Sequence, residues 1–180
     1  MRQARTGNGL GVLVLAGALA VFGDVLAQGC QPDIARYTPA ERFENTADGA
    51  IMDKQTGLMW KTCSEGQTWR RDGCQGDAGV YSWQEALLRA EAVNRGGGYA
   101  GHSDWRVPNI KELDSLVELA CFEPAINVEI FPGTPPGYFW AASPYLSDSE
   151  FAWGIGFRYG DSLIGRKTRA YHVRLVRGGY

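Results

Sequence analysis

The sequence predicts an α+β fold in which two helices pack on antiparallel sheet, with long loops pinned by disulfides. Two observations predict the helices. Ser82 and Asn109 each stand three residues before a glutamate, and apolar residues at helical spacing follow both. A third observation predicts the sheet, because large apolar residues alternate with Ala and Gly over 151–157. The helices lie in the middle of the chain with strands on either side, which indicates that helices and strands are segregated.

The first 27 residues have the features of a signal peptide. Arg2 and Arg5 give a positive start, an apolar run follows over 10–22, and residues 25–27 fit a cleavage site. The apolar run is short for a membrane span, so none is expected after cleavage. We expect an exported protein, periplasmic or secreted. Cys30 leaves the alternative of a lipoprotein, which is disfavoured because a bulky polar residue stands two positions before it.

The remaining chain is expected to be one domain. Residues 28–42 form a polar lead-in, and residues 43–180 are long enough to bury a hydrophobic core. The whole chain has 18 basic and 20 acidic residues and a formal net charge of −2. That balance argues against nucleic-acid binding. The charge is uneven along the chain, because residues 151–180 contain six basic residues but only one acidic residue, Asp161.

The first strands are expected on either side of a turn over 53–57. Residues 43–52 are predicted as the first strand, and residues 58–61 as its partner in a hairpin. Residues 63–80 are predicted as a loop because glycines recur in them.

Each helix has a predicted start and an apolar stripe. Ser82 and Glu85 form a capping box, and glycines end this helix over 94–98. Pro108 disfavours helical geometry in the residue before it, so Asn109 caps the second helix. The two stripes consist of Trp83, Ala86, Leu87, Ala90 and Val93, and of Ile110, Leu113, Leu116, Val117 and Ala120.

The last part of the chain is predicted as an antiparallel meander. Residues 138–143 form one strand, residues 151–157 a second, and residues 170–177 alternate as a third. A turn is expected over 159–161. One face of 151–157 carries only Ala152, Gly154 and Gly156. Such a bare face predicts the close approach of another segment or of a ligand.

Four cysteines, an even number in a chain expected to be exported, favour disulfide bonds. Three pairings are possible. We favour Cys63–Cys74, because these residues flank a polar loop that contains glycine. Cys30 would then pair with Cys121 and tie the lead-in to the end of the second helix.

No metal, cofactor or catalytic site is predicted. The sequence has no Cys-x-x-Cys, and its histidines are His102 and His172. Asp72 and Asp77 lack the spacing of an EF-hand, so a solvated loop is the preferred interpretation. His102, Ser103 and Asp104 are neighbours in sequence, which does not make a catalytic triad. Gly-x-Ser-x-Gly, His-Glu-x-x-His and phosphate-loop motifs are absent from the sequence. We therefore expect a protein that is not an enzyme.

The segment Ser-Asp-Trp-Arg-Val-Pro-Asn-Ile-Lys-Glu-Leu over 103–113 is the most specific motif. Thr-Gly-Leu-Met-Trp over 56–60 precedes it, and Phe-Trp-Ala-Ala-Ser over 139–143 and Val-Arg-Leu-Val-Arg over 173–177 follow it. In these motifs the chain resembles the Lcl C-terminal domain family over residues 43–178. The motif residues with an expected structural role are Trp60, Trp83, Asp104, Trp105, Arg106, Pro108, Glu112, Trp140, Trp153 and Arg177.

The resemblance implies an exported bacterial domain with relatives of C-type-lectin-like and formylglycine-generating-enzyme-like fold. In the collagen-like adhesin that gives the family its name, the domain is associated with sulfated glycosaminoglycans and with trimers. This chain has no Gly-x-y repeat, and it has no cysteine after Cys121. The oxidase activity of the enzyme relatives is therefore not carried over.

We expect an adhesion-type binding module for a sulfated or other acidic polysaccharide. The candidate ligand residues are Arg158, Arg166, Lys167, Arg169 and Arg174, which would bind sulfate through charge-assisted hydrogen bonds. The alternative for these residues is a solvated sheet face whose arginines oppose edge pairing. The alternative function is a structural or assembly protein at the cell surface, which binds a protein partner or forms a homo-oligomer through its aromatic face.

Overall fold

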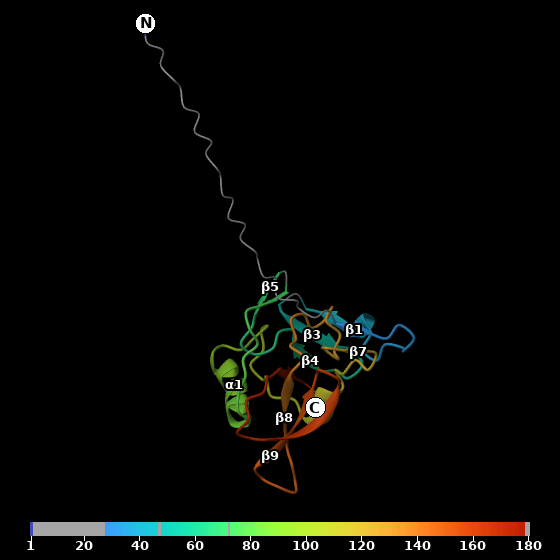
Figure 1. Cartoon of the computed structure of the whole chain (residues 1–180). Coiled ribbons are helices and arrows are strands. Elements are labelled where there is room, and N and C mark those ends of the chain that lie inside the picture. Colours follow the sequence, from blue (N-terminus) through green and yellow to red (C-terminus); the bar gives the residue numbers. More distant parts are fainter. Residues whose placement is uncertain (2–27, 47, 72, 179–180) are drawn as a thin grey trace.

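A computed structural model describes residue 1 and residues 28–46, 48–71 and 73–178 (Figure 1). The predicted signal peptide, apart from Met1, and Asp72 lie outside the described residues. The elements in chain order are β1 (Gly29–Cys30), the 3₁₀ helix η1 (Ala40–Arg42), β2 (Phe43–Asn45), β3 (Ala50–Asp53), β4 (Met59–Lys61), β5 (Thr68–Arg70), β6 (Gly73–Gln75), α1 (Trp83–Arg95), α2 (Ile110–Asp114), β7 (Cys121–Phe122), β8 (Tyr138–Pro144), β9 (Phe151–Gly156), β10 (Asp161–Arg166) and β11 (Val176–Arg177).

The described strands form antiparallel sheets, and the predicted α+β class is confirmed. The sheet orders are β1-β7, β11-β4-β3-β2, β5-β6 and β10-β9-β8. Helix α1 lies at one side of the molecule, and the loop between β8 and β9 protrudes at the end opposite β5 (Figure 1). None of the described helices has the length and apolar character needed to cross a membrane. The C-type-lectin-like part of the expectation stays a prediction.

Both predicted capping boxes are present. The amide of Ser82 donates to the Glu85 carboxylate at 2.8 Å, and the Glu85 amide donates back to the Ser82 hydroxyl. Asn109 and Glu112 make the same exchange, at 2.8 and 2.9 Å. These reciprocal bonds satisfy amides that have no partner inside the helix, so the chain turns helical at these points.

The second helix is shorter than its apolar stripe predicts. It ends at Asp114, whereas the stripe runs to Ala120. Val117 instead forms a bridge with Ile126, and the Glu118 amide donates to the carbonyl of Ala125. Four of its five side chains are still buried, Leu113, Leu116, Val117 and Ala120, and hydrogen bonds between residues three apart continue the chain past α2.

The N-terminal strands also differ from the prediction. Residues 43–52 were expected as one strand, but they form the hairpin β2–β3, closed by a bond from the Thr46 amide to the Ala50 carbonyl. Gly49 has a φ of +82° in this turn, which favours glycine. The predicted loop over 63–80 contains the short hairpin β5–β6.

Strands β8 and β9 are confirmed, but the third predicted strand is mostly wrong. Residues 161–166 form β10 beside β9, whereas of residues 170–177 only Val176 and Arg177 form a strand. Tyr171 pairs singly with Tyr81, and His172 pairs singly with Phe139. Since successive residues pair with different neighbours, this extended segment forms no continuous ladder.

Two hydrophobic clusters lie on opposite faces of the β10-β9-β8 sheet. Phe139 and Ile155 belong to the first cluster, together with Trp60 and Leu113. Trp140 belongs to the second, with Trp105, Val173 and Leu175 among its other members. Because side chains alternate along β8 and β9, these strands contribute residues to both clusters.

Both predicted disulfides are present. Cys30 of β1 is bonded to Cys121 of β7, and the two residues are also partners in the strand register. Cys63, just after β4, is bonded to Cys74 of β6. The bonds therefore pin the lead-in and the β5–β6 hairpin to the rest of the fold.

Candidate functional site

One end of the β10-β9-β8 sheet brings three side-chain positions together. Tyr138, Gly156 and Asp161 are direct partners across the three strands, so they lie on the same face. A Cβ atom on Gly156 would lie 2.8 Å from both Asp161 Oδ1 and a ring carbon of Tyr138. The bare face predicted from the sequence is therefore covered here by side chains of the neighbouring strands, because the Tyr138 ring and the Asp161 carboxylate lie over Gly156.

This end of the sheet opens into a pocket of about 450 Å³. We call it the tyrosine pocket, and its lining residues are Pro136, Gly137, Tyr138, Arg158, Tyr159 and Asp161. The two tyrosines are 46% and 64% exposed. Large aromatic rings exposed beside charged groups are typical of recognition surfaces.

Arg158 is held at the rim of the tyrosine pocket by Glu123. Its Nε and Nη2 atoms lie 2.7 and 2.6 Å from Glu123 Oε1, and its guanidinium lies 5.5 Å from the Tyr159 ring centroid. The hydrogen bond to Glu123 raises the pKa of Arg158. The residue is therefore a positioned cation that already has a carboxylate partner.

Tyr171 packs on the same face of the sheet. Its ring centroid lies 5.3 Å from that of Tyr138 and 4.4 Å from that of Trp140, over the position of Gly165. Burial raises the pKa of Tyr171, and the nearby charge of Arg169 opposes the shift. The Tyr171 ring thus packs against both Tyr138 of the tyrosine pocket and the buried Trp140.

The second pocket, the lysine pocket, has a volume of about 440 Å³ and is lined by Ser82, Trp83, Gln84, Lys167 and Thr168. Lys167 Nζ lies 4.2 Å from the Trp83 ring centroid, and the Lys167 carbonyl accepts from the Trp83 amide. The Trp83 indole donates to the carbonyl of Ala141 at 2.8 Å. The ring is therefore fixed, and the ammonium group rests on it as a cation–π contact.

The predicted basic residues divide into paired and unpaired groups. Arg158 pairs with Glu123, and Arg166 pairs with Glu150 at 2.6 Å. Among the described residues, no carboxylate lies within ion-pair distance of Lys167 or of Arg169. These two cations, together with Arg166, lie in one short segment at the end of β10.

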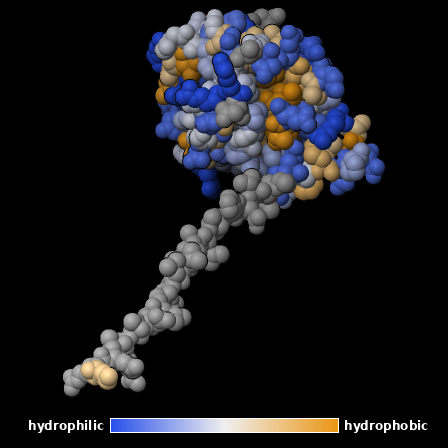
Figure 2. Space-filling model, turned by 90° about the horizontal axis from the view of Figure 1, so that it is seen from above, coloured by the Kyte–Doolittle hydropathy of each residue, from blue (hydrophilic) through white to orange (hydrophobic). Residues whose placement is uncertain are grey.

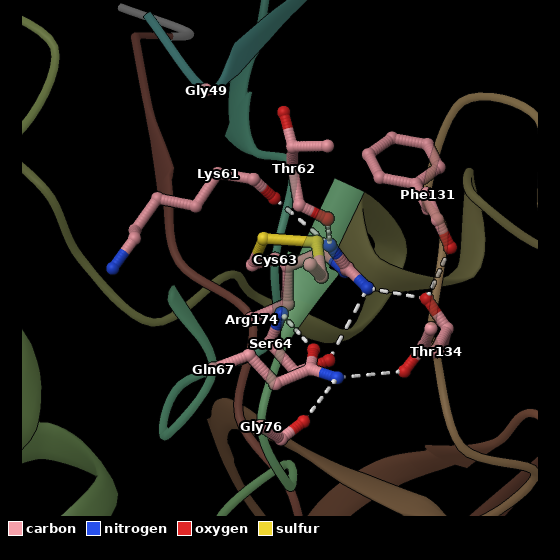
Figure 3. Close-up of a disulfide and its surroundings, with 12 residues drawn as sticks. Gly49, Lys61, Thr62, Cys63, Ser64, Gln67, Gly76, Phe131, Thr134 and Arg174 are labelled. Carbon is pink, nitrogen blue, oxygen red and sulfur yellow. Dashed lines mark hydrogen bonds between the residues drawn. A yellow bond between two sulfur atoms is a disulfide. The ribbon is translucent and has the colours of Figure 1, made fainter. Parts of the chain in front are cut away.

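The prediction that Arg174 belongs to the basic surface is wrong. Its side chain is fully buried beside Cys63 and donates to the carbonyls of Lys61 and Thr62 and to the hydroxyls of Ser64 and Thr134 (Figure 3). Burial lowers its pKa to about 9, and the charge of Glu65 opposes that shift. Arg174 is therefore charged at neutral pH and joins distant segments inside the fold.

Lys61 also contributes to the interior, but its ammonium group points away from Arg174 (Figure 3). Its Nζ atom lies 2.5 Å from Glu65 Oε1, and Arg89 contacts the other oxygen of that carboxylate at 2.8 Å. Lys61 also lies 4.4 Å from the Tyr99 ring centroid. Burial raises the pKa of Tyr99 to about 12.

The motif residues lie mostly in the interior or in ion pairs. Trp60, Trp105 and Trp140 are buried, and the carbonyl of Pro108 accepts from the amide of Ala142. Trp153 and Trp83 are half-buried. Two ion pairs, Arg106–Glu112 and Asp104–Arg177, surround the start of α2.

His102 and Asp104, which stand beside Ser103 in the sequence, make structural contacts. Asp104 accepts from Arg177 at 2.7 Å, and the main chain of His102 pairs with that of Tyr99. Burial lowers the pKa of His172, and its hydrogen bond with the Gly79 carbonyl opposes this shift. Within the described ranges, no group of three metal-ligating side chains is gathered.

Sequence reasoning missed Tyr138, Tyr159 and Asp161 as site residues. The register that joins two of them across Gly156 cannot be derived from one sequence. The bare face of 151–157 was the available signal, because it marked a place where side chains from neighbouring strands could converge.

Comparison with known proteins gives a family match. A family model described as the Lcl C-terminal domain matches residues 49–177. None of the curated protein sequences matches the chain.

Proposed function

The chain belongs to the Lcl C-terminal domain family, and for this member we propose an exported, non-enzymatic module that binds an acidic or sulfated polysaccharide. Lys167 and Arg169 are the proposed contacts, with Arg166 beside them. The observation that carries the proposal is that Lys167 and Arg169 have no carboxylate partner among the described residues, although acidic residues outnumber basic ones in the chain.

An anionic ligand would supply the missing charge. Arginine offers a planar set of N–H donors that fits sulfate or carboxylate, and lysine offers a point charge. Arg166 and its partner Glu150 are 52% and 66% exposed in their side chains. An exposed pair of this kind contributes little to stability, so Arg166 can exchange its partner for a ligand at small cost.

The lysine pocket supports a sugar polymer as the ligand. Lys167 rests on the face of Trp83, so a charged group of the ligand and an adjacent sugar ring would both find a partner there. The two disulfides support the exported location, because such bonds persist in oxidising compartments.

Heparin binding across a salt series tests the proposal. We expect binding by the oxidised protein that weakens as salt is added, and loss of binding on changing Lys167→Ala together with Arg169→Ala. The matched control changes Lys54→Ala and Arg95→Ala, which remove equal charge at exposed positions elsewhere. Absence of heparin binding at low salt in folded protein, or equal loss in the control, would refute the proposal.

Self-association is the second candidate. Leu146, in the protruding loop between β8 and β9, is 97% exposed, and Leu119 is 63% exposed. On the face seen from above, however, hydrophobic residues form small patches between hydrophilic ones (Figure 2). Light scattering on the protein and on its Leu146→Asp variant tests self-association. A concentration-dependent oligomer that the substitution disperses supports it, and a monomer at every concentration excludes it.

A further inference from the structure

We propose that the tyrosine pocket binds a neutral pyranose ring of a glycan. This site is separate from the Lys167–Arg169 surface and takes a different chemical class of ligand. Tyr138 and Asp161 line it, and they meet over Gly156, which has no side chain to separate them. Arg158 and Tyr159 reach it from the turn between β9 and β10.

The dimensions of the pocket suit one sugar ring. Tyr138 and Asp161 lie on strands separated by β9, and neighbouring strands lie about 4.8 Å apart, so the two backbones are about 10 Å apart. Because Gly156 has no side chain, the Tyr138 ring and the Asp161 carboxylate meet over it, so an apolar and a polar partner stand side by side at the pocket. The volume of about 450 Å³ lies in the range of about 300 to about 1,000 Å³ that small-molecule sites occupy.

The charges of the pocket favour a neutral ligand. A cation would be attracted to Asp161 but would face the guanidinium of Arg158, and an anion would meet the reverse arrangement. A hydroxyl group both donates and accepts, so adjacent hydroxyls can donate to the carboxylate of Asp161 and accept from Arg158. Arg158 uses Nε and Nη2 on Glu123, and a guanidinium has five N–H donors, so donors remain for a ligand.

The aromatic rings supply the apolar contact. One face of a pyranose presents C–H groups, which pack on an aromatic ring, while its hydroxyls point outward to polar partners. Tyr138 is 46% exposed, and its ring is supported from behind by Tyr171 at 5.3 Å. The ring and the carboxylate stand on paired strands, so they are held in place before a ligand arrives, and little ordering is needed on binding.

Saturation-transfer NMR with cellotetraose, chitotetraose, mannotetraose and galactotetraose tests this site. We expect transfer to the ring C–H protons of at least one tetrasaccharide. Binding should persist in about 1 M NaCl, where the Debye length is about 3 Å. Tyr138→Ala and Asp161→Asn should each weaken binding by about tenfold or more. Tyr37→Ala and Asp33→Asn, at exposed positions outside the pocket, are the matched controls and should leave it unchanged.

The outcomes separate the two sites. No transfer to any of the four probes in folded protein would overturn the inference, as would binding that survives both Tyr138→Ala and Asp161→Asn. Stronger transfer to choline than to every sugar would also overturn it, because the pocket would then be a cation site. Sugar binding without heparin binding would refute the polyanion surface alone, and the reverse result would refute the tyrosine pocket alone.

Discussion

The guanidinium of Arg106 and the carboxylate of Glu112 form two parallel hydrogen bonds of 2.7 Å each. The same carboxylate accepts from the amide of Asn109, and Arg106 also donates to the carbonyl of Gly178. Glu112 therefore caps α2 and holds Arg106 at the same time. The arginine and the glutamate of the motif therefore act together at the start of α2.

We predict that Arg106→Lys lowers the free energy of unfolding by about 1.5 to about 3 kcal/mol, because lysine keeps the charge but loses the paired bonds. Urea unfolding measures the change. Arg95→Lys is the control, since Arg95 is exposed and its expected change is within about 0.5 kcal/mol. Equal stability of Arg106→Lys and the parent protein would contradict the structural role.

A buried ion pair makes acid stability depend on Asp53. Burial disfavours the charge of Asp53, but hydrogen bonds from Arg42, Thr56 and the Gln55 amide outweigh it and hold its pKa below the ordinary value. The folded pKa is lower than the unfolded value of about 3.9, so this contribution is complete above about pH 4 and is lost as the pH falls through the folded pKa.

Asp53→Asn should cost about 3 to about 5 kcal/mol at neutral pH, because it leaves Arg42 buried without a counterion. Below about pH 4 its stability should fall less steeply than that of the parent protein. Denaturant unfolding at a series of pH values checks both statements. Parallel pH profiles for the two proteins would show that Asp53 does not provide this acid sensitivity.

The two disulfides should contribute unequally. In the chain-entropy view, closing the loop of sequence separation 91 between Cys30 and Cys121 contributes about 4.6 kcal/mol, and the separation of 11 between Cys63 and Cys74 about 2.8 kcal/mol. Replacing each pair by alanines and following thermal unfolding tests the order. A greater loss from the shorter loop would show that local packing decides the effect instead.

Arg174 should be irreplaceable by lysine. Arg174→Lys keeps the charge but cannot reach the carbonyls and hydroxyls on both sides, and we expect a loss of about 3 kcal/mol or more. Arg174→Met leaves the same partners unpaired and should also be destabilised. Thermal unfolding ranks the two variants against Arg169→Lys, an exposed control. An Arg174→Met protein as stable as the parent protein would show that the buried guanidinium has no structural task.

Local chemistry made part of this fold predictable. Ser82 and Asn109 each combine a side-chain acceptor with a glutamate three residues later, so the start of both helices follows from neighbouring residues. The end of α2 does not, because Glu118 is drawn into bonds with Tyr37 and Thr38 from far along the chain. Burial raises the pKa of Glu118, but these bonds and the one from the Ala120 amide outweigh it, so its pKa lies below the ordinary value.

The candidate site was also not predictable, because contacts between residues far apart in the sequence determine it. Arg174 occupies an alternating position like that of His172, and the pattern cannot tell that both faces of this segment are buried. Arginine is rarely buried, so the surface was the natural expectation. Residues 161–166 lack the alternation of a typical strand and pair because β9 offers them an edge.

The contact between Arg174 and Thr134 has a consequence for where the chain can be opened. Thr134, Phe131 and Ile126 belong to a proline-rich stretch without regular structure, yet all three are buried. Of residues 126–134 only Glu129 and Gly133 are exposed, whereas residues 146–149 are all exposed. New termini of a circular permutant, or a protease nick, belong at 146–149, and a break at 126–134 would cut the molecule through its interior.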